Sequence, residues 1–152
     1  IVACLVGSEM CIRDRFASEH ARFADTHARV GILPGWGLSQ KLSRIIGINR
    51  AREMSLTGNF IDAERAEAWG LVNRVCAADS LLDEALASAA QIADADPKAV
   101  FALKALMNDG GKKTLGDALV LEGERGNAFA KTVDYSQMSA RLASLRQRAA
   151  KQ

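Results

Sequence analysis

Asp25 and His27 are the two side chains of this sequence whose types and spacing suit proton transfer. They stand two residues apart, just ahead of a glycine-rich loop, and in an extended backbone residues two apart point to the same side. A carboxylate beside an imidazole can act as an acid/base pair, because an imidazole ordinarily titrates near neutral pH. Both residue types are also common in loops, so the pattern alone leaves a catalytic and a purely structural interpretation open.

A second candidate is the loop Pro34-Gly35-Trp36-Gly37, which precedes a helical segment. Free backbone N–H groups and the partial positive charge of a helix N-terminus can hold a water, an oxyanion or a phosphate. The same residues also suit an ordinary tight turn. The loop lacks the Gly-Lys-Ser/Thr ending of a nucleotide-binding P-loop, so that class is excluded. Trp36 either lines an apolar ligand pocket or covers the core.

Other chemistries find little support in the sequence. The serines have no G-x-S-x-G context and neither histidine lies in H-E-x-x-H, which argues against a serine nucleophile and a zinc site. Cys4, Cys11 and Cys76 show no metal-ligand spacing, and so odd and sparse a count favours a reducing, cytoplasmic setting. The apolar run of residues 1–7 is too short to span a membrane and lacks the features of a secretory signal. No metal and no membrane partner are therefore expected.

The elements that must position these residues follow from apolar spacing and from capping residues. We expect strands at 21–24 and 71–76, a loop at 25–37, and helices at 38–46, from Asn49 as N-cap to 56, at 63–69, 80–93, 97–107, 114–133 and 137–150. Two strands are too few for a sheet that stands alone. The helices before Asp94 therefore require a sheet that this chain does not supply, which indicates part of a larger domain.

The chain divides by composition into three regions. Residues 1–15 differ from the rest, and residues 16–93 are mixed and rich in turns. Residues 94–152 are purely helical after the shift near Asp94–Pro97. The last helix contains Arg141, Arg146 and other basic residues but no acid, so it presents a solvated face or a phosphate contact. The net charge of +2 gives no reason to expect nucleic acid.

Three ordered motifs resemble the enoyl-CoA hydratase/isomerase (crotonase) superfamily. The segment ARFADTHARVGILPG of residues 21–35 resembles the stretch that runs into the Pro-Gly loop of that family. The next motif of the family is resembled by Leu56-Thr57-Gly58, Ala63, Ala66, Gly70-Leu71-Val72-Asn73 and Val75. The C-terminal helical region of the family is resembled by Leu121-Glu122-Gly123-Glu124 through Thr132 and Asp134. The resemblance covers residues 16 to about 150 and implies the C-terminal portion of the family's chain. It implies that residues 16–93 are the C-terminal part of a crotonase core, that residues 94–152 are a helical oligomerisation region, and that residues 1–15, which lie outside it, are a non-native leader.

The resemblance implies an α/β fold: the last part of a crotonase-type spiral core, mostly helical here, plus a helical trimerisation region. It implies an acyl-CoA substrate, with coenzyme A as part of the substrate and no separate cofactor, and a homo-trimer or hexamer in the intact parent of fatty acid metabolism. In the family, two backbone N–H groups polarise the thioester carbonyl and paired glutamates handle water and the proton. The N–H donors and the first glutamate belong to the earlier half, so this chain alone is expected to be inactive.

The family's second glutamate stands eight residues before the loop glycine, where this sequence has His27. Gly35, whose N–H would orient the catalytic water, is retained. One hypothesis gives the acid/base role in the full-length parent to Asp25 or His27, and the alternative is a homologue that has lost hydratase activity or acts as an isomerase. Of the two interpretations of Trp36, the one in which it lines an apolar pocket makes it a substrate-binding residue. Arg146 and Arg148 stand near the family's basic pair and would reach the phosphate of coenzyme A.

Overall fold

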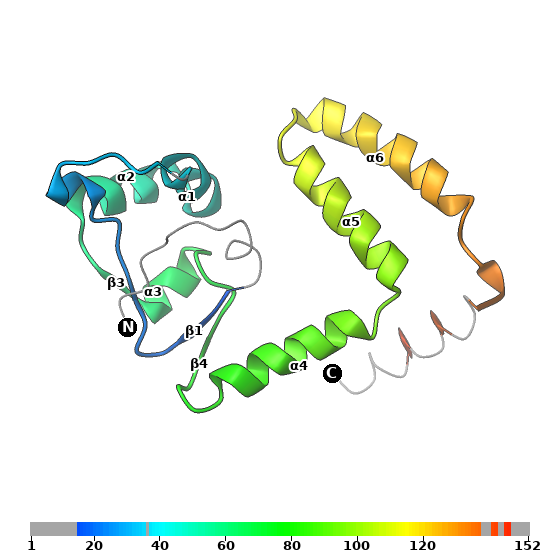
Figure 1. Cartoon of the computed structure of the whole chain (residues 1–152), viewed down its shortest axis with the longest axis horizontal. Helices are drawn as coiled ribbons and strands as arrows, with labels where there is room; N and C mark the ends of the chain where they lie inside the picture. Colours follow the sequence, from blue (N-terminus) through cyan, green and yellow to red (C-terminus); the bar gives the residue numbers. More distant parts are fainter. Residues whose placement is uncertain (1–14, 36, 138–140, 143–144, 147–152) are drawn as a thin grey trace. The chain divides into compact units, whose positions relative to one another are not determined.

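The computed structural model describes residues 15–35, 37–137, 141–142 and 145–146 of the 152 (Figure 1). The chain divides into two compact units, residues 1–91 and 92–152.

Within the described residues, the first unit contains four short strands in two pairs. β1 (Phe16–Ser18) pairs in parallel with β4 (Arg74–Cys76), and β2 (Arg22–Phe23) pairs antiparallel with β3 (Ile61–Asp62). The strand predicted at 21–24 is thus present, whereas the one predicted at 71–76 is confined to its last three residues. β1 and β3 were not predicted, because strands of two or three residues are too short to show an alternating pattern. Two-stranded sheets are marginal alone, so helices must cover them.

Glycines set the bounds of the helices in this unit. α1 (Leu38–Ile46) and α2 (Ile48–Thr57) are joined by Gly47, whose φ of 82° is one that L side chains rarely adopt. Gly47 is therefore the N-cap of α2, and the prediction that Asn49 caps this helix is wrong. Gly58, also left-handed, ends α2 as predicted, with its N–H donated to the carbonyl of Met54.

α3 (Ala63–Ala68) begins where the sequence predicted. The side chain of Asp62 caps this helix, because its Oδ1 accepts a hydrogen bond from the backbone N–H of Arg65 at 2.8 Å. Asp62 is also the last residue of β3, so strand and helix follow one another directly.

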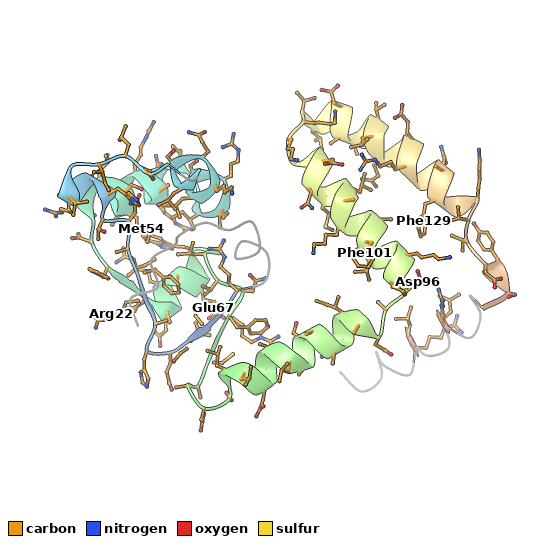
Figure 2. All side chains as sticks on the ribbon, viewed as in Figure 1. Arg22, Met54, Glu67, Asp96, Phe101 and Phe129 are labelled. Atoms are coloured by element: carbon orange, nitrogen blue, oxygen red, sulfur yellow. The ribbon has the colours of Figure 1, made fainter. Side chains whose placement is uncertain are left out.

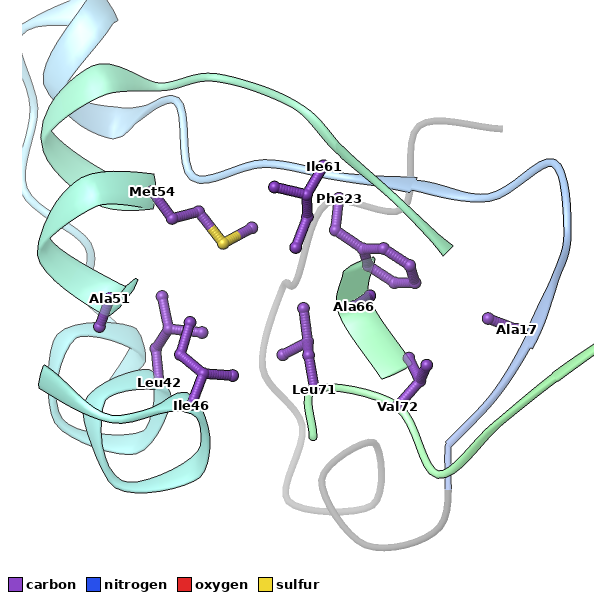
Figure 3. Packing of buried hydrophobic residues seen from close by; sticks show 10 residues of the cluster. All are labelled: Ala17, Phe23, Leu42, Ile46, Ala51, Met54, Ile61, Ala66, Leu71 and Val72. Carbon is purple, nitrogen blue, oxygen red and sulfur yellow. The ribbon is translucent and has the colours of Figure 1, made fainter. Parts of the chain in front are cut away.

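The buried side chains of the first unit form one hydrophobic core, drawn in Figure 3. Its members come from the strands, from all three helices and from the segment before β4: Ala17, Phe23, Leu42, Ile46, Ala51, Met54, Ile61, Ala66, Leu71 and Val72. In α1 the core residues stand four apart and in α2 three apart, which places each pair on one helix face. The core thereby fixes the position of α2 and of β2, the two elements that lead to the candidate site.

The second unit consists of helices. α4 (Leu81–Ala93) crosses the division between the units, and α5 (Pro97–Gly110) and α6 (Leu115–Ala130) follow. Asp96 caps α5 by accepting the N–H of Ala99 at 2.9 Å, and Pro97 occupies the first turn as predicted. α5 extends three residues beyond the predicted end at Met107. Of the last predicted helix, 137–150, residues 141–142 and 145–146 are helical, and the rest lies outside the described residues except Gln137, which ends a short 3-10 helix, Tyr135–Gln137.

α5 and α6 lie against one another and enclose an apolar groove. The groove, about 610 Å³ in volume, is lined by side chains of both helices, among them Leu103, Leu106 and Phe129. Phe101 on α5 and Phe129 on α6 are labelled in Figure 2. Arg125 on α6 forms an ion pair with Asp109 on α5 at 2.9 Å. None of the side chains of these two fully described helices is buried, and large apolar ones such as Phe101, 71% exposed, face outward.

Candidate active site

The structure brings Asp25 and His27 into direct contact. The ring Nδ1 of His27 lies 2.7 Å from Oδ1 of Asp25, and the backbone N–H of His27 donates to the same oxygen at 3.3 Å. The backbone is not extended here, since His27 begins a 3-10 helix, His27–Val30, directly after Thr26. The pairing therefore arises from a tight local turn and not from the strand-like alternation on which the prediction was based.

Asp25 is the more deeply buried member of the pair. Its side chain is 3% exposed, against 15% for that of His27. Asp25 stands two residues after Phe23, the buried core residue of β2, so the packing of the core holds its backbone in place. A buried carboxylate beside a partly accessible imidazole is an arrangement that can exchange a proton through the imidazole alone.

Ser55 is a third member of this cluster. It lies on α2, one residue after the core residue Met54, and its side chain forms a hydrogen bond with the carboxylate of Asp25. Burial by itself raises the pKa of Asp25. The hydrogen bonds from Ser55 and His27 and the charge of the imidazole act in the opposite direction and prevail, so the pKa of Asp25 lies below its ordinary value of 3.8. The carboxylate is thus ionised at neutral pH.

Arg29 ties the 3-10 helix to the end of α2. Its Nε donates a hydrogen bond to the carbonyl of Thr57, and its side chain passes so close to Gly58 that a Cβ there would lie 2.5 Å from its Cγ. The segment that contains His27 is therefore anchored to α2 at two points, through Arg29 and through Ser55. Neither contact was predicted.

The Pro-Gly loop leads from the 3-10 helix to α1. Gly35 is exposed and has open space where a side chain would begin, and Gly37, with φ of 80°, directly precedes the helix. The loop thus opens a helix as predicted. Trp36 lies outside the described residues.

The remaining predicted site residues belong to the second unit. Arg146 is exposed in a helical piece of the chain, and Arg148 lies outside the described residues. Arg141 forms an ion pair with Asp96 at 3.0 Å, so one arginine of the basic C-terminal segment has an acidic partner from the start of α5.

Two classes of site find no counterpart in the described part of the chain. It contains no group of three or more His, Cys, Asp or Glu side chains arranged to hold a metal ion. Within the same residues, no helix is both long enough and apolar enough to cross a membrane.

Residues 9–134 match the family model of enoyl-CoA hydratase/isomerase. The match covers most of the chain, and it includes Asp25, His27, the Pro-Gly loop, all three helices of the first unit, and α4, α5 and α6. The chain therefore belongs to the enoyl-CoA hydratase/isomerase family.

Curated relatives agree with this assignment. The chain is 50% identical over 113 residues to "Probable enoyl-CoA hydratase 1, peroxisomal" of Arabidopsis thaliana, a match that covers 74% of this chain and 43% of that protein. It is 42% identical over 106 residues to "Probable enoyl-CoA hydratase" of Rhizobium meliloti, a match that covers 70% of this chain and 41% of that protein. The chain thus spans less than half the length of these relatives.

Solved structures identify the fold as crotonase-type. An enoyl-CoA hydratase of Bacillus anthracis superposes with a TM-score of 0.76 at 32% identity, over 91% of this chain and 52% of that one. A protein of Thermobifida fusca, solved in complex with acetoacetyl-CoA, superposes with a TM-score of 0.74 at 28% identity. The superposition covers 79% of this chain and 47% of that one. The mostly helical architecture described above is accordingly a partial crotonase-type α/β fold.

Proposed function

We propose that this chain is the C-terminal part of an enoyl-CoA hydratase-like protein that adds water to an enoyl-CoA thioester. The observation that carries the proposal is the Asp25–His27 pair: a buried, ionised carboxylate holds an imidazole where the family's hydratases have their second glutamate, eight residues before Gly35. An imidazole can take over the proton transfer of a glutamate, since its ordinary pKa lies near neutral pH. The complex of the Thermobifida fusca relative with acetoacetyl-CoA supports an acyl-CoA substrate.

The other roles belong to the same proposal. His27 exchanges the proton, the N–H of Gly35 orients the water, Trp36 lines the acyl pocket, and Arg146 and Arg148 contact the phosphates of coenzyme A. Residues 16–93 complete the spiral core, and residues 94–152 mediate assembly into a trimer or hexamer. The parent protein acts in fatty acid metabolism in the cytoplasm.

The chain alone is proposed to be inactive. Thioester activation requires two N–H donors at the carbonyl oxygen, and removal of a single such donor costs roughly 10²–10³-fold in rate. The family supplies these donors from its earlier half, and this chain spans only 43% of its Arabidopsis relative. Incubation of the purified chain with a short enoyl-CoA should therefore leave the absorbance of the conjugated double bond unchanged. Measurable turnover would refute this part of the proposal.

A chimera tests the activity of the parent. The preceding half of the Arabidopsis relative is joined to residues 16–152, and hydration of a short enoyl-CoA is followed by the same absorbance. We expect turnover, and we expect His27→Ala to lower kcat roughly 10²–10⁴-fold, the range of a general acid/base. His20→Ala is the matched control, because His20 is largely exposed and belongs to the same unit. Equal rates for the two variants would remove His27 from the mechanism.

Two alternatives are tested in the same chimera. If it isomerises a 3-enoyl-CoA but hydrates no 2-enoyl-CoA, the parent is an isomerase. If it binds acyl-CoA in a calorimetric titration without converting either substrate, it is a binding homologue that has lost hydratase activity.

The exposed apolar side chains of α5 and α6 favour a further possibility for the isolated chain, a helical oligomerisation module. Size-exclusion chromatography with light scattering tests it, and a folded, strictly monomeric chain would exclude it.

A further inference from the structure

We propose that Asp25 and Ser55 are positioning residues for His27: together they hold its imidazole in the tautomer that carries the hydrogen on Nδ1, which leaves Nε2 as the nitrogen that exchanges protons. The inference rests on the proposed function for its purpose, but its structural content can be tested without any substrate.

The assignment of the tautomer follows from the contact between the two side chains. Which ring nitrogen carries the hydrogen is inferred from the partner that each nitrogen meets. An ionised carboxylate can only accept hydrogen bonds, and Nδ1 of His27 lies 2.7 Å from Oδ1 of Asp25, within hydrogen-bond distance. Nδ1 must therefore be the donor, and Nε2 of a neutral ring is left with its lone pair.

The state of the carboxylate is set by the groups around it. Three donors from the described residues meet it: the Nδ1–H and the backbone N–H of His27, and the hydroxyl of Ser55. All three favour the ionised form, and they outweigh the effect of burial, so the pKa of Asp25 is lowered. A carboxylate that is 3% exposed and engaged in this way is poorly placed to take a proton from a substrate. Of the two residues left open by the sequence, His27 is thus the one that exchanges the proton, and Asp25 acts through it.

Ser55 adds a constraint that His27 and Asp25 cannot supply for each other. The two are neighbours in one turn, whereas Ser55 lies on α2, whose position is fixed by the core residues Ala51 and Met54. Its hydrogen bond to Asp25 therefore ties the pair to the packed interior of the unit. A further hydrogen-bond partner on the carboxylate that holds a catalytic side chain restricts the orientation of that side chain, which must meet a substrate at a defined place.

Nitrogen-15 NMR of the whole chain tests the tautomer directly. The chain has two histidines, His20 and His27, so each pair of ring nitrogens can be assigned, and the exposed His20 is the internal reference. For neutral His27 we expect a protonated Nδ1 and an unprotonated Nε2. We expect Asp25→Asn, which removes the charge but keeps the shape, to reduce the ratio of the two tautomers about tenfold, the equivalent of about 1.4 kcal/mol. A wild-type chain with the hydrogen mainly on Nε2 of His27 would overturn the inference.

The role of Ser55 has its own readout, the carbon-13 titration of the Asp25 carboxylate. Ser55→Ala should raise the titration midpoint of Asp25 relative to the wild-type chain, because one donor to the ionised form is lost. Ser43→Ala is the matched control: Ser43 lies on α1, and its hydroxyl bonds only to the backbone carbonyls of Ser39 and Gln40. An unchanged midpoint in Ser55→Ala would remove Ser55 from the proposal.

The chimera separates this inference from the proposed function. Asp25→Asn should lower kcat roughly 10²-fold or more with little change of KM, because orientation of the imidazole matters in the transition state and not for binding. A chimera that hydrates no substrate, together with an Nδ1–H tautomer in the chain, would refute the function but not the positioning. Normal hydration together with an Nε2–H tautomer would refute the positioning but not the function.

Discussion

Replacement of Asp25 by alanine should destabilise the first unit by about 3–4 kcal/mol. The carboxylate accepts hydrogen bonds from the ring of His27, from the backbone N–H of His27 and from the hydroxyl of Ser55. A buried donor left without an acceptor costs about 1–3 kcal/mol. Water can reach the partly exposed ring of His27 and replace part of the hydrogen bond that the ring loses. The total cost for the three donors is therefore expected in the lower part of the range obtained by adding their individual costs. Removal of one member of a buried pair is typically destabilising by a similar amount.

Urea denaturation at pH 7, followed by far-ultraviolet circular dichroism, measures the effect. The free energy of unfolding is compared for the wild-type chain, Asp25→Ala and Asp79→Ala. Asp79 is an exposed carboxylate of the same unit, so its removal should change the free energy by less than about 0.5 kcal/mol. A loss below about 1 kcal/mol in Asp25→Ala, with an unchanged dependence on urea, would refute the argument that these three hydrogen bonds hold the turn together.

Three further predictions concern the same unit. Leu71→Ala should cost about 2–5 kcal/mol in urea denaturation because Leu71 is 1% exposed, whereas Leu82→Ala, at a position 68% exposed, should cost little. Gly58→Ala should cost about 1–2 kcal/mol, since φ is 63° and the new Cβ would meet Arg29; thermal denaturation should show part of this cost recovered when Arg29→Ala is added. The free energy that ionised Asp25 contributes is fully present above the ordinary pKa of 3.8 that it has in the unfolded chain, and it is lost as the pH falls through the lower folded pKa. Below about pH 5, the stability advantage of wild type over Asp25→Asn should therefore shrink in acid titrations.

The helices of the fold could be predicted well because local residues bound them. α1 begins and ends as predicted, since Gly37 and Gly47 flank it. The start of α2 was predicted wrongly for a local reason too: Gly47 serves both helices, so no room remains for Asn49 as a cap. β1 could not be predicted, because its three residues depend on a partner strand 58 residues further along the chain. Such pairing depends on the packing of the whole unit, which a local pattern does not contain.

The candidate site was predictable in its centre but not in its surroundings. The spacing of Asp25 and His27 indicated that the two side chains meet, although the turn that joins them was not foreseen. Ser55 stands 30 residues from Asp25 in the sequence, and a lone serine in a helix carries no pattern that would indicate its contact. That contact exists because α2 packs beside the 3-10 helix that begins at His27, where Arg29 also bonds to the end of α2.

The absence of buried side chains in α5 and α6 has a consequence for how fast backbone amides exchange hydrogen with solvent. When α5 separates from α6, little apolar surface is newly exposed, because no side chain of either helix is buried at the start. The free energy of such an opening is therefore small, and amide protons of these helices should be replaced by deuterium early. Amides of α2, held by Ala51 and Met54 in the core, should be replaced much later than those of α5 and α6.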